Sequence, residues 1–321
     1  MEPSADKESF RAALASAKSV IILSGAGLSA ASESKRLRRP RGLQERPEWG
    51  MEILPSPAIR VGRHLLHPTS TADDQGDVSN RYLRAQANDA HRALATLAHP
   101  PTLARIAPQH TAPYALHVTQ NVDALALRVL ESLPVLKGED ASAVEEAIIE
   151  MHGDIFVTRC TSCNHTQRSY APALASALAE LEREVLGGGA AASEAPGPVI
   201  TLEQLPRCGG DAWAGSNRYG RCGGLLRPEV VWFGEVPPQA GEVSRRMSSC
   251  DLLLVVGTSS LVYPAAGYAA QVKKNGGKVA VFNLGRSAGD GKADYLFLGP
   301  CDEMLPEVLD VRKDMANLWK S

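Results

Sequence analysis

Long apolar runs are missing from this sequence. No stretch approaches the roughly 18 apolar residues of a membrane-spanning helix, so we expect no membrane partner. An excess of one charge is also missing, because 34 Lys and Arg face 36 Asp and Glu, a formal net charge of −2. A chain without a basic surplus gives no sign of direct nucleic-acid binding.

The first 16 residues lack the apolar core of a secretory signal, and they carry three acidic side chains, which transit peptides tend to avoid. We therefore expect an intracellular protein, with the cytoplasm or nucleus favoured and the mitochondrion as the alternative. We also expect a monomer. Inside the cell, the six cysteines are better interpreted as metal ligands or free thiols than as disulfides.

Six short apolar runs have the composition of strands buried on both faces of a parallel sheet. They cover residues 20–23, 115–118, 147–151, 252–256, 278–282 and 295–298. Helical patterns lie between them, for example at residues 89–97 and 267–274. The alternation predicts an α/β fold with a doubly wound, mostly parallel, Rossmann-like sheet. The loops after the strands of such a sheet are where it binds ligands.

Four of the cysteines are spaced like zinc ligands. Cys160 and Cys163 form a C-x2-C pair, and Cys208 and Cys222 follow as a second, more widely spaced pair. Four thiolates complete a tetrahedral zinc site without an open position, which favours a structural role over a catalytic one. The alternative is four unrelated cysteines or a redox pair.

For the domain organisation, we predict that residues 1–321 form one catalytic domain with a small zinc-binding module inserted at residues 156–226. Residues 33–86 do not follow the rhythm of strands and helices, since they are rich in Arg, Pro and Ser and have little periodicity. This atypical segment is predicted to be irregular or poorly packed.

Residues 19–30 have the pattern of a strand that runs into a G-x-G-x-x-A turn. Gly25 permits the tight turn, and Gly27 lets the backbone approach a pyrophosphate, which the free N–H groups of a following helix could bind. A glycine-rich turn without a ligand is the alternative. No convincing acidic residue stands about 20 positions later, which argues against a standard Rossmann dehydrogenase.

Polar residues follow two more of the predicted strands. Asn121 and Asp123 come after the run at 115–118 and would suit a nicotinamide-ribose, and His152 with Gly153 comes after the run at 147–151. His152 could act as a general base, because the unperturbed pKa of histidine lies near neutrality. A structural, hydrogen-bonded histidine is the alternative.

Together and in this order, these motifs resemble those of the sirtuin family, over roughly residues 15–30 and 88–310. The matching motifs are the G-A-G-x-S of Gly25, Ala26, Gly27 and Ser29, the T-Q-N-x-D of Gln120, Asn121 and Asp123, the H-G of His152, the cysteine quartet, the V-x-F-G-E of Val231, Trp232, Phe233, Gly234 and Glu235, the G-T-S of Gly257, Thr258 and Ser259, and the late Asn283 and Cys301. Residues 225–232 and 261–266 are most similar to the class III branch, which is associated with acidic acyl groups.

The resemblance implies an NAD-dependent protein-lysine deacylase that moves the acyl group to ADP-ribose and releases nicotinamide and free lysine. It implies NAD contacts from the G-A-G-x-S, T-Q-N-x-D and G-T-S motifs, Asn283 and Cys301, and a structural zinc ion on the cysteine quartet. His152 would be the general base, and Asn121 and Asp123 would position the ribose and nicotinamide. Residues 231–235 would bind acyl-lysine proteins or peptides, their backbone pairing with an extended substrate strand.

The chain also departs from the family. Residues 33–42 do not match the G-I-P-x-F-R that follows the glycine turn, so the Phe and Arg that cover the nicotinamide are missing. The class III Tyr-x-x-Arg is missing too, because Tyr82 and Arg84 have the wrong spacing. Residues 33–81 are either an altered cofactor loop or a reading-frame error. The alternative functions are therefore a catalytically impaired NAD-binding or zinc scaffold and a mono-ADP-ribosyl transferase.

Overall fold

The computed structural model describes residues 2–30, 32, 85–133, 146–170, 206–209, 222–232, 234–258, 265–287 and 290–319. The chain divides into two compact units. The first combines residues 1–37, 86–153 and 231–321, and the second combines residues 38–85 and 154–230. Residues 33–84 of the atypical segment lie outside the described residues. Its irregularity, and the boundaries of the zinc module, therefore stay predictions.

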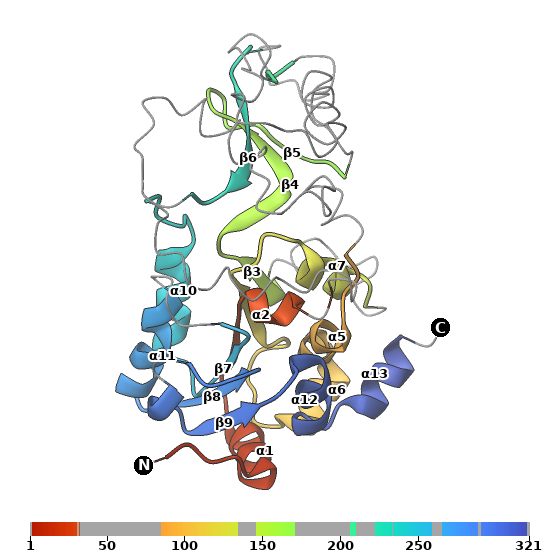
Figure 1. Ribbon diagram of the computed structural model, residues 1–321, viewed down its shortest axis with the longest axis vertical. Coiled ribbons are helices and arrows are strands. Elements are labelled where there is room, and N and C mark those ends of the chain that lie inside the picture. The colour runs from red at the N-terminus through yellow and green to blue at the C-terminus, as the bar shows by residue number, and fades with distance from the viewer. Residues whose placement is uncertain are drawn as a thin grey trace, which may run out of the picture. The chain divides into compact units, whose positions relative to one another are not determined.

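The first unit contains a six-stranded sheet in which each strand runs parallel to its neighbours (Figure 1). Its strands are β1 (Val20–Ser24), β2 (Leu116–Thr119), β3 (Ile148–Glu150), β7 (Leu252–Val256), β8 (Lys278–Asn283) and β9 (Tyr295–Leu298). They stand in the order β3-β2-β1-β7-β8-β9. The predicted doubly wound parallel sheet is confirmed, and each predicted apolar run supplies one strand.

Burial on both faces explains why the most apolar runs form the centre of the sheet. All five residues of β1 and all five of β7 are buried, as expected for parallel strands that are covered on both sides. Successive side chains alternate between two cores. Ile22 packs in the same core as Phe10 and Phe282, whereas Ile21 packs in the core that holds Met247.

Helices cover both faces of this sheet. One core receives α1 (Lys7–Ser16), α2 (Ala26–Ser29), α5 (Asp89–Ala95), α6 (Pro100–Ile106) and α12 (Cys301–Val308). The opposite core receives α10 (Ala240–Ser248) and α11 (Ala265–Lys274). A third cluster packs α7 (Leu125–Glu131) with β3, the 3-10 turn η1 (Thr96–Ala98) and the end of α13 (Arg312–Leu318). A further 3-10 turn, η2 (Asp290–Lys292), precedes β9. The first unit is therefore a three-layer α/β/α structure.

The order of the strands reverses at β1, which lies between β2 and β7. In open α/β sheets a ligand-binding crevice forms at such a reversal, outside the carboxyl ends of the strands. The polar motifs found in the sequence follow β1, β2, β3, β7 and β8 directly. All of them therefore stand along this one edge of the sheet.

The second unit contains a three-stranded sheet in the order β5-β4-β6. Its strands are β4 (Gly153–Cys160), β5 (Thr166–Arg168) and β6 (Leu226–Val230), and β4 and β5 are antiparallel. Buried and partly exposed residues alternate along β4, the pattern of a sheet with one covered face. The buried Asp154 accepts a hydrogen bond from Phe156 N at 2.7 Å and forms an ion pair with Arg168, which fixes the start of the β4–β5 hairpin.

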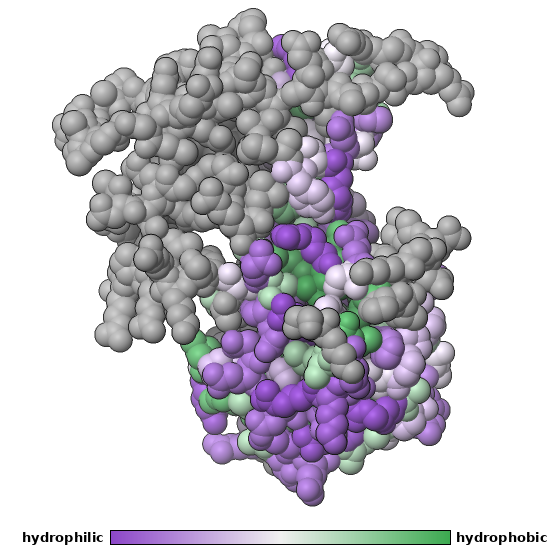
Figure 2. Space-filling view, turned by 90° about the vertical axis from the view of Figure 1, so that its right-hand side faces the viewer, coloured by the Kyte–Doolittle hydropathy of each residue, from purple (hydrophilic) through white to green (hydrophobic). Residues whose placement is uncertain are grey.

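The described surface in Figure 2 is mostly hydrophilic. Large apolar side chains that are exposed among the described residues are Tyr170, Val236, Leu284 and Leu298. No helix in the described part of the chain is both long and apolar enough to cross a membrane.

Candidate active site and metal centre

Two glycine turns lie back to back at the carboxyl ends of β1 and β7. A Cβ on Gly27 would lie 2.6 Å from the Cα of Gly257. A Cβ on Gly257, whose φ is +61°, would lie 2.4 Å from the N atom of Leu28. Both positions need glycine because the two backbones touch. The sequence explained Gly27 by the approach of a pyrophosphate, and the structure adds this contact between the two halves of the sheet.

The N–H groups of the first turn are partly used by the protein itself. Gly27 donates to the Gly257 carbonyl at 2.7 Å, and Leu28 donates to the Gly25 carbonyl at 3.0 Å. These two groups are not the free donors that the sequence predicted. The following helix, α2, is also short, with four residues.

A hydrogen-bond network joins this turn to the loop after β2. The Ser29 hydroxyl donates to Asp123 Oδ2 at 2.6 Å. Because its single proton is used there, the Ser29 oxygen accepts from Asn121 Nδ2 at 3.1 Å. His91 Nε2 lies 3.3 Å from the same oxygen. Three residues predicted from two separate motifs, Ser29 from one and Asn121 and Asp123 from the other, are thus brought together.

Two buried histidines close to this network were not singled out from the sequence. Burial, with a smaller contribution from the charge of Arg92, lowers the pKa of His91 from 6.5 to about 4. Burial also lowers the pKa of His117 to about 3, and His117 Nε2 lies 2.7 Å from the Ser24 hydroxyl. Both imidazoles are therefore neutral at pH 7. His117 lies within an apolar run, where periodicity gives no signal of a polar contact.

The sequence did hold a signal for His91. Asn88 caps α5, and its side-chain oxygen accepts from Ala90 N at 2.9 Å and from His91 N at 3.2 Å. The Asn88 amide also donates to the Leu28 carbonyl at 2.8 Å. An Asn followed three residues later by a side chain that bonds back to it is a capping box. This pattern places His91 against the glycine turn.

These neutral histidines predict acid sensitivity. Their pKa values lie below the value near 6.5 of the unfolded chain. The unfolded state therefore binds more protons below pH 6.5, and stability is lost as the pH falls from there toward 4 and 3. Between pH 7 and pH 5 we expect the free energy of unfolding to drop by about 3–4 kcal/mol. Urea titrations at these pH values would measure the drop.

A matched pair of variants tests whether the buried histidines cause this drop in the free energy of unfolding. His117→Gln should remove roughly half of the drop, because one of the two titrating groups is gone. His110→Gln, at a partly exposed histidine outside this network, should leave most of the drop in place. An undiminished drop in His117→Gln would contradict the assignment.

His152 follows β3, and its Nδ1 lies 3.0 Å from the carbonyl oxygen of Gln120. A carbonyl can only accept, so Nδ1 carries a proton, and in the neutral ring Nε2 carries the lone pair. The backbone holds the residue on both sides, since Met151 N donates to Thr119 O and Val231 N donates to His152 O, each at 2.9 Å. This fixed, half-buried imidazole has the tautomer that a general base needs.

The loops after β2, β7 and β8 are also linked. Gln120 Nε2 donates to the Thr258 hydroxyl at 3.3 Å, and Asn283 Nδ2 donates to the Thr258 carbonyl at 3.2 Å. The buried Cys301 thiol donates to the Phe282 carbonyl at 3.8 Å. Five predicted cofactor contacts, Gln120, Gly257, Thr258, Asn283 and Cys301, are thereby placed along one edge. Ser259 lies outside the described residues.

The predicted substrate segment forms a turn closed by Glu235. The Trp232 N–H donates to Glu235 Oε2 at 3.0 Å, and the Glu235 N–H donates to the Trp232 carbonyl at 2.9 Å. The Val231 N–H is already bonded to His152, as described above. A substrate strand could use these donors only after displacing their present acceptors. Gly234 has φ +90°, and Phe233 lies outside the described residues.

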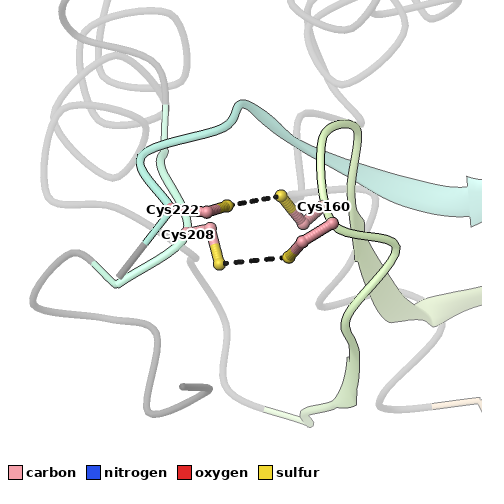
Figure 3. Close-up of side chains that lie close together, drawn as sticks. Cys160, Cys208 and Cys222 are labelled. Carbon is pink, nitrogen blue, oxygen red and sulfur yellow. Dashed lines mark hydrogen bonds between the residues drawn. The ribbon is translucent and has the colours of Figure 1, made fainter. Parts of the chain in front are cut away.

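The four predicted cysteines converge in the second unit, and their Sγ atoms all lie within 4.8 Å of one another. The thiols face each other in two pairs (Figure 3), with Sγ–Sγ distances of 3.4 Å for Cys160–Cys222 and 3.8 Å for Cys163–Cys208. Sulfurs about 2.3 Å from a tetrahedral zinc ion are about 3.8 Å apart. The quartet therefore fits a zinc ion.

Thiol chemistry leads to the same conclusion. A hydrogen bond with the backbone of His165 contributes most to lowering the pKa of Cys163 to about 7. Although the backbone of Gly224 favours the Cys222 thiolate, the neighbouring sulfur of Cys160 and burial raise the pKa of Cys222 to about 12. Four sulfurs this close do not ionise together in the absence of a cation, whereas a bound metal deprotonates its thiols.

Comparison with known proteins decides the family. A family model described as the Sir2 family matches residues 25–264, more than half of the chain. The chain belongs to the Sir2 family. The sirtuin resemblance of the sequence is thus confirmed, and the fold agrees with it.

Individual relatives cover nearly the whole sirtuin chain. The NAD-dependent protein deacylase sirtuin-5, mitochondrial, of Canis lupus familiaris is 35% identical over 309 residues, covering 96% of this chain and 86% of the relative. The NAD-dependent protein deacylase of Thermococcus kodakarensis is 32% identical over 305 residues, covering 94% of each. A crystal structure of a Sir2 homologue–NAD complex has a TM-score of 0.59 and 27% identity, covering 98% and 97%. The sirtuin-5 relatives agree with the class III features.

Proposed function

We propose that this sirtuin is an NAD-dependent protein-lysine deacylase that produces nicotinamide, O-acyl-ADP-ribose and free lysine. The observation that carries the proposal is His152, an imidazole at the ligand-binding edge of the sheet whose Nδ1 donates to the Gln120 carbonyl. The names of the canine and archaeal relatives, both NAD-dependent protein deacylases, support the activity. The solved Sir2 homologue–NAD complex supports the choice of NAD.

The residues proposed to hold NAD belong to the motifs that come after strands of the six-stranded sheet in the sequence. They are Gly25, Ala26, Gly27, Ser29, Gln120, Asn121, Asp123, Gly257, Thr258, Ser259, Asn283 and Cys301. Amide, hydroxyl and backbone groups of this kind suit the hydroxyls and phosphates of a dinucleotide. When bound, NAD supplies the ribose carbon that the acyl oxygen attacks as nicotinamide leaves.

The protein's own groups have separate roles in this proposal. His152 Nε2 takes the proton of a ribose hydroxyl, while Gln120 O retains the Nδ1 proton and keeps the ring oriented. Asp123 cannot turn, because Ser29 bonds one carboxylate oxygen and Leu125 N bonds the other at 3.0 Å. Asn121 is held by the same Ser29 oxygen. Prior fixation of these groups lowers the entropic cost of reaching the reactive geometry.

The remaining components are a substrate segment and a structural metal. Residues 231–235 are proposed to hold acyl-lysine proteins or peptides beside His152, since Val231 is bonded to the backbone of that residue. Cys160, Cys163, Cys208 and Cys222 would hold zinc with no open coordination position, which assigns the metal to folding and not to the reaction.

For the compartment, we propose a location inside the cell. The names of vertebrate relatives say mitochondrial, which supports the mitochondrial alternative and gives no support to the preference for cytoplasm or nucleus. A monomer without direct nucleic-acid contacts stays a prediction.

Nicotinamide release tests the proposed function. The purified full chain should release nicotinamide from NAD only when an acyl-lysine peptide is present, with free lysine and O-acyl-ADP-ribose formed in equal amounts. Chromatography of the products measures all three. No release would favour the scaffold, for which the missing Phe and Arg of residues 33–42 are the reason. ADP-ribose on protein acceptors would favour the transferase.

A further inference from the structure

In the loop that follows β8, residues 283–292, hydrogen bonds link three of the residues that the structure describes. The buried Asp290 carboxylate accepts from Ser287 N at 2.6 Å and from the Ser287 hydroxyl at 2.7 Å, one bond to each oxygen. Asn283 Nδ2 in turn lies 3.4 Å from the Ser287 Oγ. Asp290 is the one acidic residue in this loop, and its carboxylate is turned inward and already bonded.

The adenosine end of the dinucleotide falls at this loop if the proposed function holds. His152 must face the ribose that carries nicotinamide, which places that end over β2 and β3. The other end then lies across the reversal, over β8 and β9. Leu284 is 77% exposed and Leu298 is 42% exposed at the ends of these two paired strands. Exposed apolar side chains at this position suit the face of a purine ring.

Arg286 lies in the same loop, and its charge is not paired with a described residue. It is exposed, and within the described part of the chain it makes no hydrogen bond or ion pair. The nearest acidic residues along the neighbouring element, Asp302 and Glu303, lie in the first turn of α12, where the helix N-terminus attracts negative charge. In Rossmann-like sites a carboxylate binds the free ribose 2′-hydroxyl, whereas an arginine accommodates a 2′-phosphate.

We propose that Arg286 determines how the site treats the 2′ position of the adenosine ribose, so that the protein accepts a 2′-phosphorylated adenine dinucleotide as well as NAD. The guanidinium forms charge-assisted hydrogen bonds with the phosphate. The loop offers no available carboxylate to repel that phosphate. This inference rests on the proposed function, because it needs a dinucleotide in the site.

Calorimetric titration of the full chain with ADP-ribose and with its 2′-phosphate tests the proposal without requiring turnover. The wild-type protein should bind the two probes with dissociation constants within about 3-fold of each other. Arg286→Ala should weaken binding of the 2′-phosphate by about 10-fold or more, since a charge-assisted contact is lost. The same variant should bind ADP-ribose within about 2-fold of wild type. Lys292→Ala, at another exposed cation of the loop, should leave the affinity for both probes unchanged.

The outcomes distinguish a failure of the role proposed for Arg286 from a failure of the proposed dinucleotide site. If ADP-ribose binds and its 2′-phosphate is rejected, or if Arg286→Ala leaves the ratio unchanged, the role of Arg286 is overturned and the deacylase proposal stands. If neither probe binds, the dinucleotide site itself is overturned. Arg286→Glu should have the opposite effect. A carboxylate at this position should make the protein prefer ADP-ribose to its 2′-phosphate.

Discussion

His152→Ala is expected to lower the turnover of an acyl-lysine peptide by about 10²–10⁴-fold, the usual contribution of a general base. The reason is that the hydrogen bond from Nδ1 to the Gln120 carbonyl leaves Nε2 as the nitrogen that takes a proton from the substrate. Binding of ADP-ribose should change far less than turnover, because the contacts proposed for the G-A-G-x-S, T-Q-N-x-D and G-T-S motifs remain. Steady-state nicotinamide release and calorimetry measure the two quantities separately.

His110→Ala is the matched control. The Nδ1 of this partly exposed histidine also lies close to a backbone carbonyl, that of Ala112 at 2.9 Å, but the residue stands away from the motifs of the edge. Its replacement should leave turnover unchanged. If His152→Ala instead lowered the melting temperature and spared the turnover of the folded fraction, His152 would be a structural residue and not the base.

Cys208→Ser is expected to have the largest effect on stability. Losing one of four thiolates removes metal-binding energy that is also folding energy, so we expect most of the zinc to be lost. The free energy of unfolding of the second unit should fall by more than about 4 kcal/mol. Elemental analysis and chelator-induced unfolding measure the two effects.

Cys250→Ala provides the comparison for the zinc prediction. Cys250 is also a buried cysteine, but it packs between the sheet and the helices of the first unit. This variant should keep full zinc content whatever its stability. Full zinc occupancy in Cys208→Ser would remove Cys208 from the metal site.

The sheet could be predicted because both of its faces are covered. Parallel strands that are covered on both sides have continuous apolar sequences, and such a run can be recognised without knowing which strand it pairs with. The predicted ends were less accurate, since β1 includes Ser24, β2 includes Thr119 and β8 includes Asn283. These polar residues are buried. Their place in the ladder depends on hydrogen bonds that hydrophobicity alone does not indicate.

The candidate site was predictable where one short motif carried the chemistry, as with the cysteine quartet and His152. It was not predictable where the contact joins distant segments. His117 meets Ser24 across 93 positions, and His91 meets Ser29 across 62. The contact between Gly27 and Gly257 is another case. A sequence pattern shows which residues suit a ligand, but not which backbones must touch.

The central position of β1 has a consequence for biosynthesis. One edge of β1 pairs with β2, but the other must wait for β7, which begins at Leu252, about 230 residues after Val20. At 5–20 residues per second, a ribosome needs roughly 10–50 s to make that interval. During this time the most apolar strands of the nascent chain keep an unpaired edge, which is a template for aggregation. We expect newly made chains to depend on chaperones until the last third of the protein has emerged.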